Sequence, residues 1–105
     1  MDIIIQQDIN LIKESVLQAV PAEAIYLFGS HAYGTPNDES DIDIYVVVPD
    51  GTTNFGELYG KILMILRKKK RRVNLDMKLV HSGVFHRRKN GPTLERAVAQ
   101  KGTML

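Results

Sequence analysis

The sequence predicts an α/β (α+β) fold in which a small mixed β-sheet is flanked by helices. Two observations carry this prediction. Apolar residues three and four positions apart form helical stripes in the first 20 residues and again after residue 54. Short apolar or alternating segments, bounded by turn formers, have the pattern of strands. The 105 residues have room for one hydrophobic core, so we expect a single domain over residues 1–105.

The expected order of elements is helix, strand, strand, helix, strand, helix. The first helix begins after Asp2, which can cap it, and stops before Pro21. An apolar run at residues 24–28 predicts the first strand. Turn formers fill residues 34–40 and predict a loop, after which residues 41–48 form the second strand.

The second half of the chain begins with a long helix. Asn54 and Glu57 have the spacing of a capping box at its start. Residues 73–80 alternate apolar and polar side chains, which predicts a strand with one buried face. Pro92 suits the first turn of the last helix, and Gly102 follows its end.

Some residues are expected to serve the fold rather than the chemistry. His81 and His86 have no carboxylate at metal-ligand spacing, so we expect loop positions for them and not ligand roles. Met104-Leu105 is an apolar terminus that can dock on this chain or on a partner. The aromatic residues expected to pack in or beside the core are Tyr26, Tyr45 and Phe55.

Composition excludes several classes of protein. No apolar run approaches about 18 residues, so we expect no membrane span. The amino terminus lacks the basic segment of a secretory signal. The absence of cysteine excludes disulfides and thiolate metal sites. A cytoplasmic protein fits these features.

Charge is distributed unevenly along the chain. Residues 1–60 carry one base against ten acids, a balance of −9, whereas residues 61–105 carry thirteen bases against two acids, a balance of +11. The segment 67–72 is a run of six bases. It can end a helix, where cations complement the dipole, or it can bind nucleic acid. We favour the helix end, because no aromatic residues are interleaved with the bases.

Gly29-Ser30 directly follows the first predicted strand. Glycine allows a ligand to approach the main chain closely, and the N–H groups that follow can donate to it together with the serine hydroxyl. A phosphate group suits such a turn. The alternative is a plain turn between two elements.

Asp41 and Asp43 lie two residues apart in the second predicted strand, so they share a face. Two carboxylates about 4 Å apart repel by about 4 kcal/mol at an effective dielectric of about 20. A magnesium ion removes this repulsion and prefers oxygen ligands. The alternative is a solvated polar face. The residues expected to face the core from this strand are Ile42, Ile44, Val46 and Val48.

Asp76 lies on the polar face of the third predicted strand. If this strand neighbours the second one, its carboxylate can join Asp41 and Asp43 on one face of the sheet. The alternative is that Asp76 simply points outward together with Asn74 and Lys78.

These residues together resemble a known family. Gly29-Ser30, ten intervening residues and Asp41-x-Asp43 resemble the GS-x10-DxD signature of the DNA polymerase β-like nucleotidyltransferase superfamily. The small size and the later lone aspartate look like its minimal nucleotidyltransferase branch, and the similarity runs from about residue 5 to the last helix. The positions that carry the resemblance are Gly29, Ser30, Gly34, Ser40, Asp41, Asp43 and Asp76.

The resemblance implies a polymerase β-like fold and a role for each motif. Gly29 and Ser30 would hold the β- and γ-phosphates of ATP. The carboxylates of Asp41 and Asp43 would bind two Mg²⁺ ions, and Asp76 would complete the metal site nearest the acceptor hydroxyl and accept its proton. Such ions bracket the α-phosphate while pyrophosphate leaves. The positions assigned to nucleotide binding are Gly29, Ser30, Gly34 and Ser40.

One departure concerns a basic residue that the branch often carries before its inner glycine. Here Tyr33 precedes Gly34, and His31 follows the serine. The phosphate-neutralising charge is then missing, or it is supplied by Lys78 or by the basic segment 67–72. This departure bears on the turnover rate more than on the fold.

The resemblance also implies partners. In the minimal branch the nucleotidyltransferase is an antitoxin that adenylylates a tyrosine of a HEPN-type toxin, so we expect a macromolecular acceptor of this kind. The alternative is an antitoxin that neutralises its toxin by binding alone. Nucleic-acid binding through residues 67–72 is a third hypothesis, and a homo-oligomer is compatible with the sequence.

Overall fold

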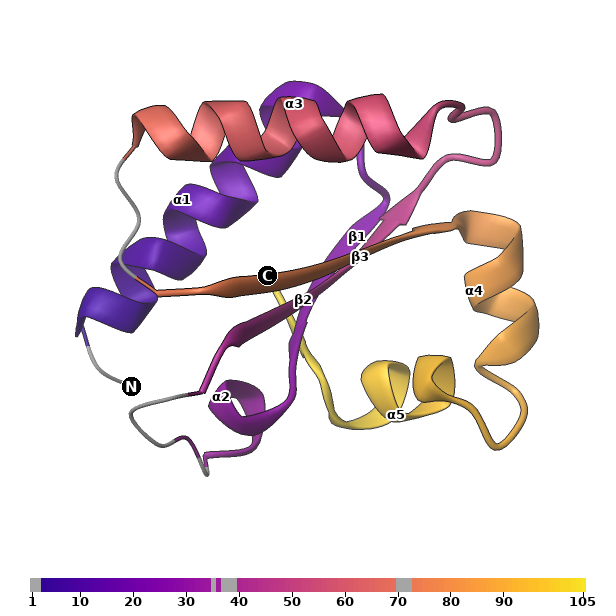
Figure 1. The fold of residues 1–105 in the computed structure, drawn as a ribbon. Coiled ribbons are helices and arrows are strands. Elements are labelled where there is room, and N and C mark those ends of the chain that lie inside the picture. The colour runs from indigo at the N-terminus through magenta and orange to yellow at the C-terminus, as the bar shows by residue number, and fades with distance from the viewer. Residues whose placement is uncertain (1–2, 35, 37–39, 70–72) are drawn as a thin grey trace.

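The fold is built on a four-stranded mixed sheet with the strand order β3-β2-β1-β4 (Figure 1). It is seen in a computed structural model that describes residues 3–34, 36, 40–69 and 73–105. The elements in chain order are α1 (Ile3–Ala19), β1 (Ala24–Phe28), α2 (Ser30–Tyr33), β2 (Ile42–Val48), α3 (Phe55–Lys68), β3 (Leu75–His81), α4 (Ser82–Arg88), α5 (Leu94–Lys101) and β4 (Thr103–Met104).

The sheet is mixed, as predicted. Strand β2 runs antiparallel to β1 and parallel to β3, and helix α3 makes the crossover between the two parallel strands. Strand β4 pairs antiparallel with β1. In Figure 1, α1 and α3 lie on one side of the sheet, and α2 and α5 lie on the other.

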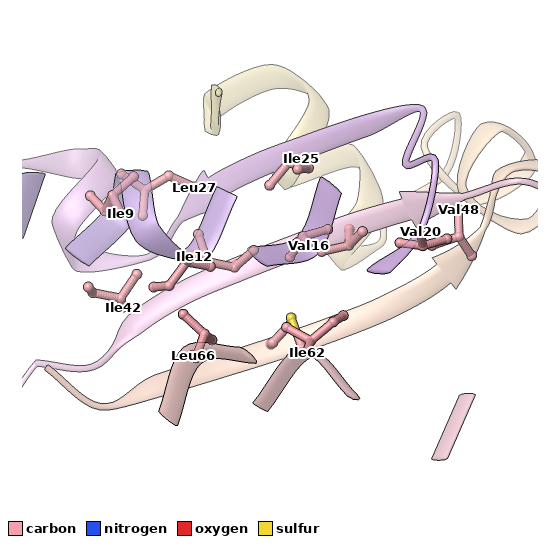
Figure 2. Close-up of a cluster of buried hydrophobic side chains, with 13 residues drawn as sticks. Ile9, Ile12, Val16, Val20, Ile25, Leu27, Ile42, Val48, Ile62 and Leu66 are labelled. Carbon is pink, nitrogen blue, oxygen red and sulfur yellow. The ribbon is translucent and has the colours of Figure 1, made fainter. Parts of the chain in front are cut away.

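The main core lies between the sheet and helices α1 and α3 (Figure 2). One helical stripe of α1, including Ile9, Ile12 and Val16, is buried against the sheet. Helix α3 adds Ile62 and Leu66 from its own stripe. The β2 side chains in this cluster are the four that alternation predicted: Ile42, Ile44, Val46 and Val48.

A second, smaller cluster covers part of the opposite face of the sheet. Tyr45 and Val47 point to that face and pack against Phe85 of α4 and Val98 of α5. The rings of Tyr45 and Phe85 lie 5.5 Å apart. Helices α4 and α5 therefore cover the Val47 end of this face. The other end, at Asp43, is not part of this apolar cluster.

Several boundaries differ from the sequence prediction. Strand β2 begins at Ile42 and β3 at Leu75, each later than predicted, and the first turn of α5 follows Pro92 without including it. The capping box is wrong: Asn54 precedes α3 with φ 59° and makes no side-chain cap hydrogen bond. Thr93 instead caps α5, since its side chain accepts from the Arg96 N–H.

The prediction of loop positions for His81 and His86 is also wrong. His81 is the last residue of β3, and His86 lies in helix α4. The Nε2–H of His81 donates to the Thr52 carbonyl at 2.7 Å, and its ring lies 4.6 Å from that of Phe55. These contacts tie the end of β3 to the start of α3. Such long-range partners leave no local pattern in the sequence.

The apolar terminus docks on this chain. Met104 lies in β4, and the Leu105 N–H donates to the Ile25 carbonyl at 2.8 Å while its side chain packs against the main core. In the basic segment, Arg67 and Lys68 form the last turn of α3, as favoured; residues 70–72 lie outside the described residues. Of the helices that the structure describes, none has the length and apolar character to cross a membrane.

A buried hydrogen-bonded group fastens α5 to the sheet. The Tyr45 hydroxyl donates to Glu95 Oε2 at 3.0 Å, and Arg88 Nε donates to Glu95 Oε1 at 2.6 Å. Burial by itself would raise the pKa of Glu95, but the hydrogen bonds from Arg88 and Tyr45 outweigh burial and lower it. The ionised carboxylate is thus the form that the fold favours.

We predict that Glu95→Gln lowers the free energy of unfolding by about 1 kcal/mol at neutral pH, because it removes a charged acceptor from both partners. A pKa lowered by folding gives stability that is present above the unfolded value and lost as pH falls through the folded value. The deficit measured by urea unfolding should therefore shrink below the ordinary value of 4.5. An unchanged deficit at acid pH would contradict this assignment.

Candidate functional site

Two of the predicted acidic residues lie side by side on neighbouring strands. The register of the parallel pair places Asp43 of β2 opposite Asp76 of β3. Partners in a ladder lie on the same face of the sheet, about 4.8 Å apart along the hydrogen-bonding direction. Asp41 directly precedes β2, two residues before Asp43, and is exposed, as is Asp76. The predicted meeting of the two strands at these positions is confirmed.

The pKa of Asp43 reflects the closeness of the three carboxylates. Partial burial raises the pKa of Asp43 above its ordinary value, and the carboxylates of Asp76 and Asp41 raise it further. His31 and Lys78 act in the opposite direction. A positive charge that enters the site would therefore stabilise the ionised form of Asp43.

Gly29 brings the end of β1 against this cluster. Its backbone has φ 73° and ψ −160°, a combination that only glycine adopts readily. A Cβ placed on Gly29 would collide with Oδ2 of Asp43. The register explains this proximity, because Phe28 is the β1 partner of Asp43. Glycine is required here both by the turn and by the carboxylate beside it.

The turn continues into the four-residue helix α2, as expected for a sharp turn after a strand. The N–H groups of Ala32 and Tyr33 both donate to the Gly29 carbonyl at 3.1 Å. Ser30 and His31, as the first two residues of the helix, have no intrahelical acceptor for their N–H groups. Gly34 ends the helix with φ 77° and donates its N–H to the Ser30 carbonyl.

His31 is a site residue to which the sequence assigned no role. Its side chain is buried, and Nε2–H donates to the carbonyl of Ser40 at 3.1 Å. Ser40 directly precedes Asp41, so this bond joins the turn after β1 to the acidic end of β2. Its place after Gly29-Ser30 is the one signal for this histidine in the sequence, and it does not predict the bond to Ser40.

Lys78 and the turn after β1 lie on opposite sides of β2. Lys78 belongs to β3, is exposed, and stands on the same strand face as Asp76, two residues away. Strand β2 separates it from β1 and therefore from Gly29-Ser30. Lys78 thus stands beside the carboxylates, on the side away from the predicted phosphate turn. Tyr33, which replaces the expected basic residue, is exposed at the end of α2.

The three aspartates have the ligand chemistry that magnesium prefers. Asp41, Asp43 and Asp76 supply only carboxylate oxygens, the ligand type that Mg²⁺ prefers, and the mutual repulsion at Asp43 favours a bound cation. Within the described ranges, no group of three or more His, Cys, Asp or Glu side chains is arranged so that it could hold a metal ion. Like charges that repel one another would be drawn together by an ion. The two-ion site remains a prediction.

The family of the chain follows from its sequence match. A family model described as Nucleotidyltransferase domain matches residues 9–98, a range that contains the turn and all three aspartates. The chain belongs to the nucleotidyltransferase domain family. Family and fold together support a nucleotidyl transfer function and therefore a transferase.

A solved structure agrees with the family. The chain resembles a crystal structure from Sulfolobus solfataricus of a protein proposed to be a nucleotidyltransferase, with a TM-score of 0.56 and 25% sequence identity. The match covers 99% of this chain and 86% of that chain. The predicted nucleotidyltransferase fold is thereby confirmed. No curated protein matches the sequence closely enough to show a relationship.

We predict that Gly29→Ala lowers the free energy of unfolding more than Gly34→Ala does. The positive φ alone should cost about 1–3 kcal/mol, and the new methyl group must displace the Asp43 carboxylate. Gly34→Ala is the comparison variant, since φ has the same sign there and the space around its Cβ is open, while its ψ of 20° belongs to the left-handed region that other residues enter more readily. Urea unfolding should find the larger loss for Gly29→Ala. Equal losses would mean that the contact with Asp43 is unimportant.

We further predict that Asp43→Asn stabilises the metal-free protein. Removing one of three neighbouring charges relieves a repulsion of about 1 kcal/mol, or roughly 4–8 °C in Tm for a domain of this size. Thermal unfolding in EDTA should detect the gain. Added Mg²⁺ should then raise the Tm of the wild type and leave the variant nearly unchanged. An equal Mg²⁺ response in both proteins would contradict the carboxylate site.

Proposed function

We propose that this protein transfers a nucleoside monophosphate, in the first instance AMP from ATP, to a hydroxyl group of a macromolecular acceptor. The proposal is carried by one observation: Asp43 lies between Asp76 on the neighbouring strand and the Gly29 turn, with Asp41 beside it. Acidic side chains and a phosphate-holding turn at one place suit phosphoryl chemistry, in which positioning and charge neutralisation supply most of the catalysis.

The order of the strands suggests how the substrates lie. The Gly29-Ser30 turn at the end of β1 would hold the β- and γ-phosphates with its N–H groups and the Ser30 hydroxyl. Strand β2 is the next strand, so Asp41 and Asp43 would face the α-phosphate. Strand β3 follows on the far side, so Asp76 would face the acceptor hydroxyl.

In the transfer step, the acceptor oxygen forms a bond to the α-phosphorus as the bond from that phosphorus to the bridging oxygen breaks. The hydroxyl proton passes to the Asp76 carboxylate, and pyrophosphate leaves with the bridging oxygen. Mg²⁺, when bound by Asp41, Asp43 and Asp76, supplies charge neutralisation for the entering and leaving oxygens. Gly34 would shape the end of the phosphate turn, while His31 holds Ser40 so that Asp41 stays beside the turn.

The acceptor that we propose is a tyrosine of a HEPN-type partner protein. What supports it is the resemblance of the Gly29-Ser30 and Asp41-x-Asp43 motifs to the minimal branch, in which this pairing occurs. A chain that adenylylates such a toxin partner, and so inactivates it, would act as an antitoxin. The rival proposal is an antitoxin that neutralises its partner by binding alone.

The test is label transfer from α-³²P-ATP in the presence of Mg²⁺ and a candidate partner protein. The wild type should label the partner, and both Asp41→Asn and Asp76→Asn should reduce the rate by at least roughly a hundredfold, the scale of losing one electrostatic contact to the transition state. Glu57→Gln, an exposed acid in α3 away from the carboxylates, is the matched control and should transfer label normally.

The outcomes separate the hypotheses. Transfer that is lost in both aspartate variants and kept in Glu57→Gln supports the enzyme. Tight binding of the partner without label supports the binding antitoxin. Labelling of added RNA in place of protein would redirect the proposal to a nucleic-acid acceptor, and transfer that survives Asp76→Asn would remove this residue from the mechanism.

A further inference from the structure

Strand β3 lies at an open edge of the sheet. Its only strand partner among the described residues is β2, so the seven-residue strand has a free outer side. Figure 1 views the sheet from this edge, with β3 running across the front and no described element before it. An edge of this length offers a row of backbone donors and acceptors to another strand.

The ladder to β2 fixes which backbone groups are free. The Asn74 carbonyl accepts from the Ile42 N–H at 2.8 Å, so residue 74 points its backbone toward β2. Backbone direction alternates along a strand, and residues 76, 78 and 80 therefore also point toward β2. The outward backbone groups belong to Leu75, Met77 and Leu79.

The side chains around this edge are symmetric in character about Met77. The sequence reads Leu75-Asp76-Met77-Lys78-Leu79, with an acid and a base at equal distances from the central residue. Leu75 and Leu79 pack against the main core, while Asp76 and Lys78 are exposed on the opposite face. Reversing the direction of the strand exchanges acid with base and leucine with leucine.

We infer that two copies of this chain pair antiparallel along β3, about a twofold axis at Met77, to form one continuous eight-stranded sheet. In this register the outward groups of Met77 meet those of its partner copy, and Leu75 meets Leu79. Asp76 of each copy faces Lys78 of the other. An isologous contact of this kind needs a self-complementary surface, and this segment has one.

The charges favour this occupant over others. Charged side chains, lysine above all, commonly protect an edge strand from pairing, because like charges placed opposite each other repel a second copy. Here the antiparallel register turns both charged residues into attractive pairs at non-hydrogen-bonded positions, where cross-strand side chains approach closest. A nucleic acid would instead bring its phosphates against Asp76.

Helix α3 provides additional surface for the same contact. It connects β2 to β3 and lies nearer the β3 edge than α1 does (Figure 1). Two of its apolar side chains, Leu63 and Met64, are exposed, Met64 by 65%. Joining the two sheets at β3 would bring the two α3 helices toward each other on one face. Exposed apolar side chains there would then be partly buried.

The dimer would also bring a residue of the partner copy to the candidate site. Lys78 of the partner copy would stand beside Asp76 on its open flank, on the side where the proposed acceptor hydroxyl enters. Each site would then hold residues from two copies. This consequence does not require the proposed transfer reaction, because the pairing is defined by backbone and side chains alone.

Sedimentation equilibrium over a wide concentration range tests the dimer directly. The wild type should associate to a dimer. Lys78→Glu should raise the dissociation constant of the dimer by roughly tenfold or more, since each of the two symmetric pairs becomes repulsive. Lys101→Glu, an exposed charge reversal in α5, is the matched control and should leave association unchanged. The double variant Asp76→Lys/Lys78→Asp restores complementarity and should recover the dimer.

Amide hydrogen exchange, followed by NMR at low and high protein concentration, locates the interface. Protection that grows with concentration should appear at the N–H groups of Leu75, Met77 and Leu79, which have no strand partner in the single copy. A monomer at every concentration overturns the inference. So does a dimer that ignores Lys78→Glu or protects other amides. ATP binding and label transfer do not enter either measurement, so failure here leaves the proposed function standing.

Discussion

The register between β2 and β3 is the constraint on which the site depends. It places Asp43 opposite Asp76, and a slip of one residue would turn the Asp76 carboxylate to the face that α1 and α3 cover. The register is held at its start by two hydrogen bonds. The Asn74 carbonyl accepts from Ile42, and the Val73 N–H donates at 2.7 Å to Asp8, a carboxylate of α1 that is only 3% exposed. The first helix thereby fixes where the last carboxylate lies.

The two faces of β2 divide the work of the fold. One face is apolar along its whole length and packs on two helices. The other face carries Asp43 at one end and Tyr45 and Val47 at the other, where α4 and α5 cover it. The bonds of Tyr45 and Arg88 to Glu95 hold this cover in place. Because α5 is fastened there, the acidic end of the face stays accessible to a substrate.

The sequence was sufficient where local pattern and burial agree. Alternation in β2 and the helical stripe of α1 predicted which side chains enter the core, and the spacing of Asp41 and Asp43 predicted two carboxylates at one end of a strand. The pairing of Asp76 with Asp43 could be predicted only as a condition, because strand adjacency is a long-range property. Helix α4 was missed because the polar His86 suggested a loop, whereas the helix is held by Phe85, whose ring packs against Tyr26 and Tyr45 of distant strands.

Partners formed by distant residues account for the other omissions. Nothing in the local sequence of His31 indicates that its ring bonds to the carbonyl before Asp41, and nothing near Asn54 indicates that its backbone adopts a positive φ in place of a capping bond. The sequence predicts which residues form the site, whereas the pairing of the strands determines how far apart they lie. The resemblance to nucleotidyltransferases predicts that these residues meet, and the register of β2 and β3 agrees with that prediction.

A backbone conformation open only to glycine and a repulsion between carboxylates meet in one small part of this fold. Gly29 adopts a conformation closed to other residues, and Asp43 beside it is ionised less readily than an ordinary aspartate. Elsewhere the described residues are well satisfied, and none of their buried side-chain polar atoms lacks a hydrogen-bond partner. Proteins commonly depart from the preferences that stabilise a fold, such as separation of like charges, at their functional sites. The close approach of Gly29 to Asp43 therefore agrees with the proposed binding of a cation and a phosphate at this place.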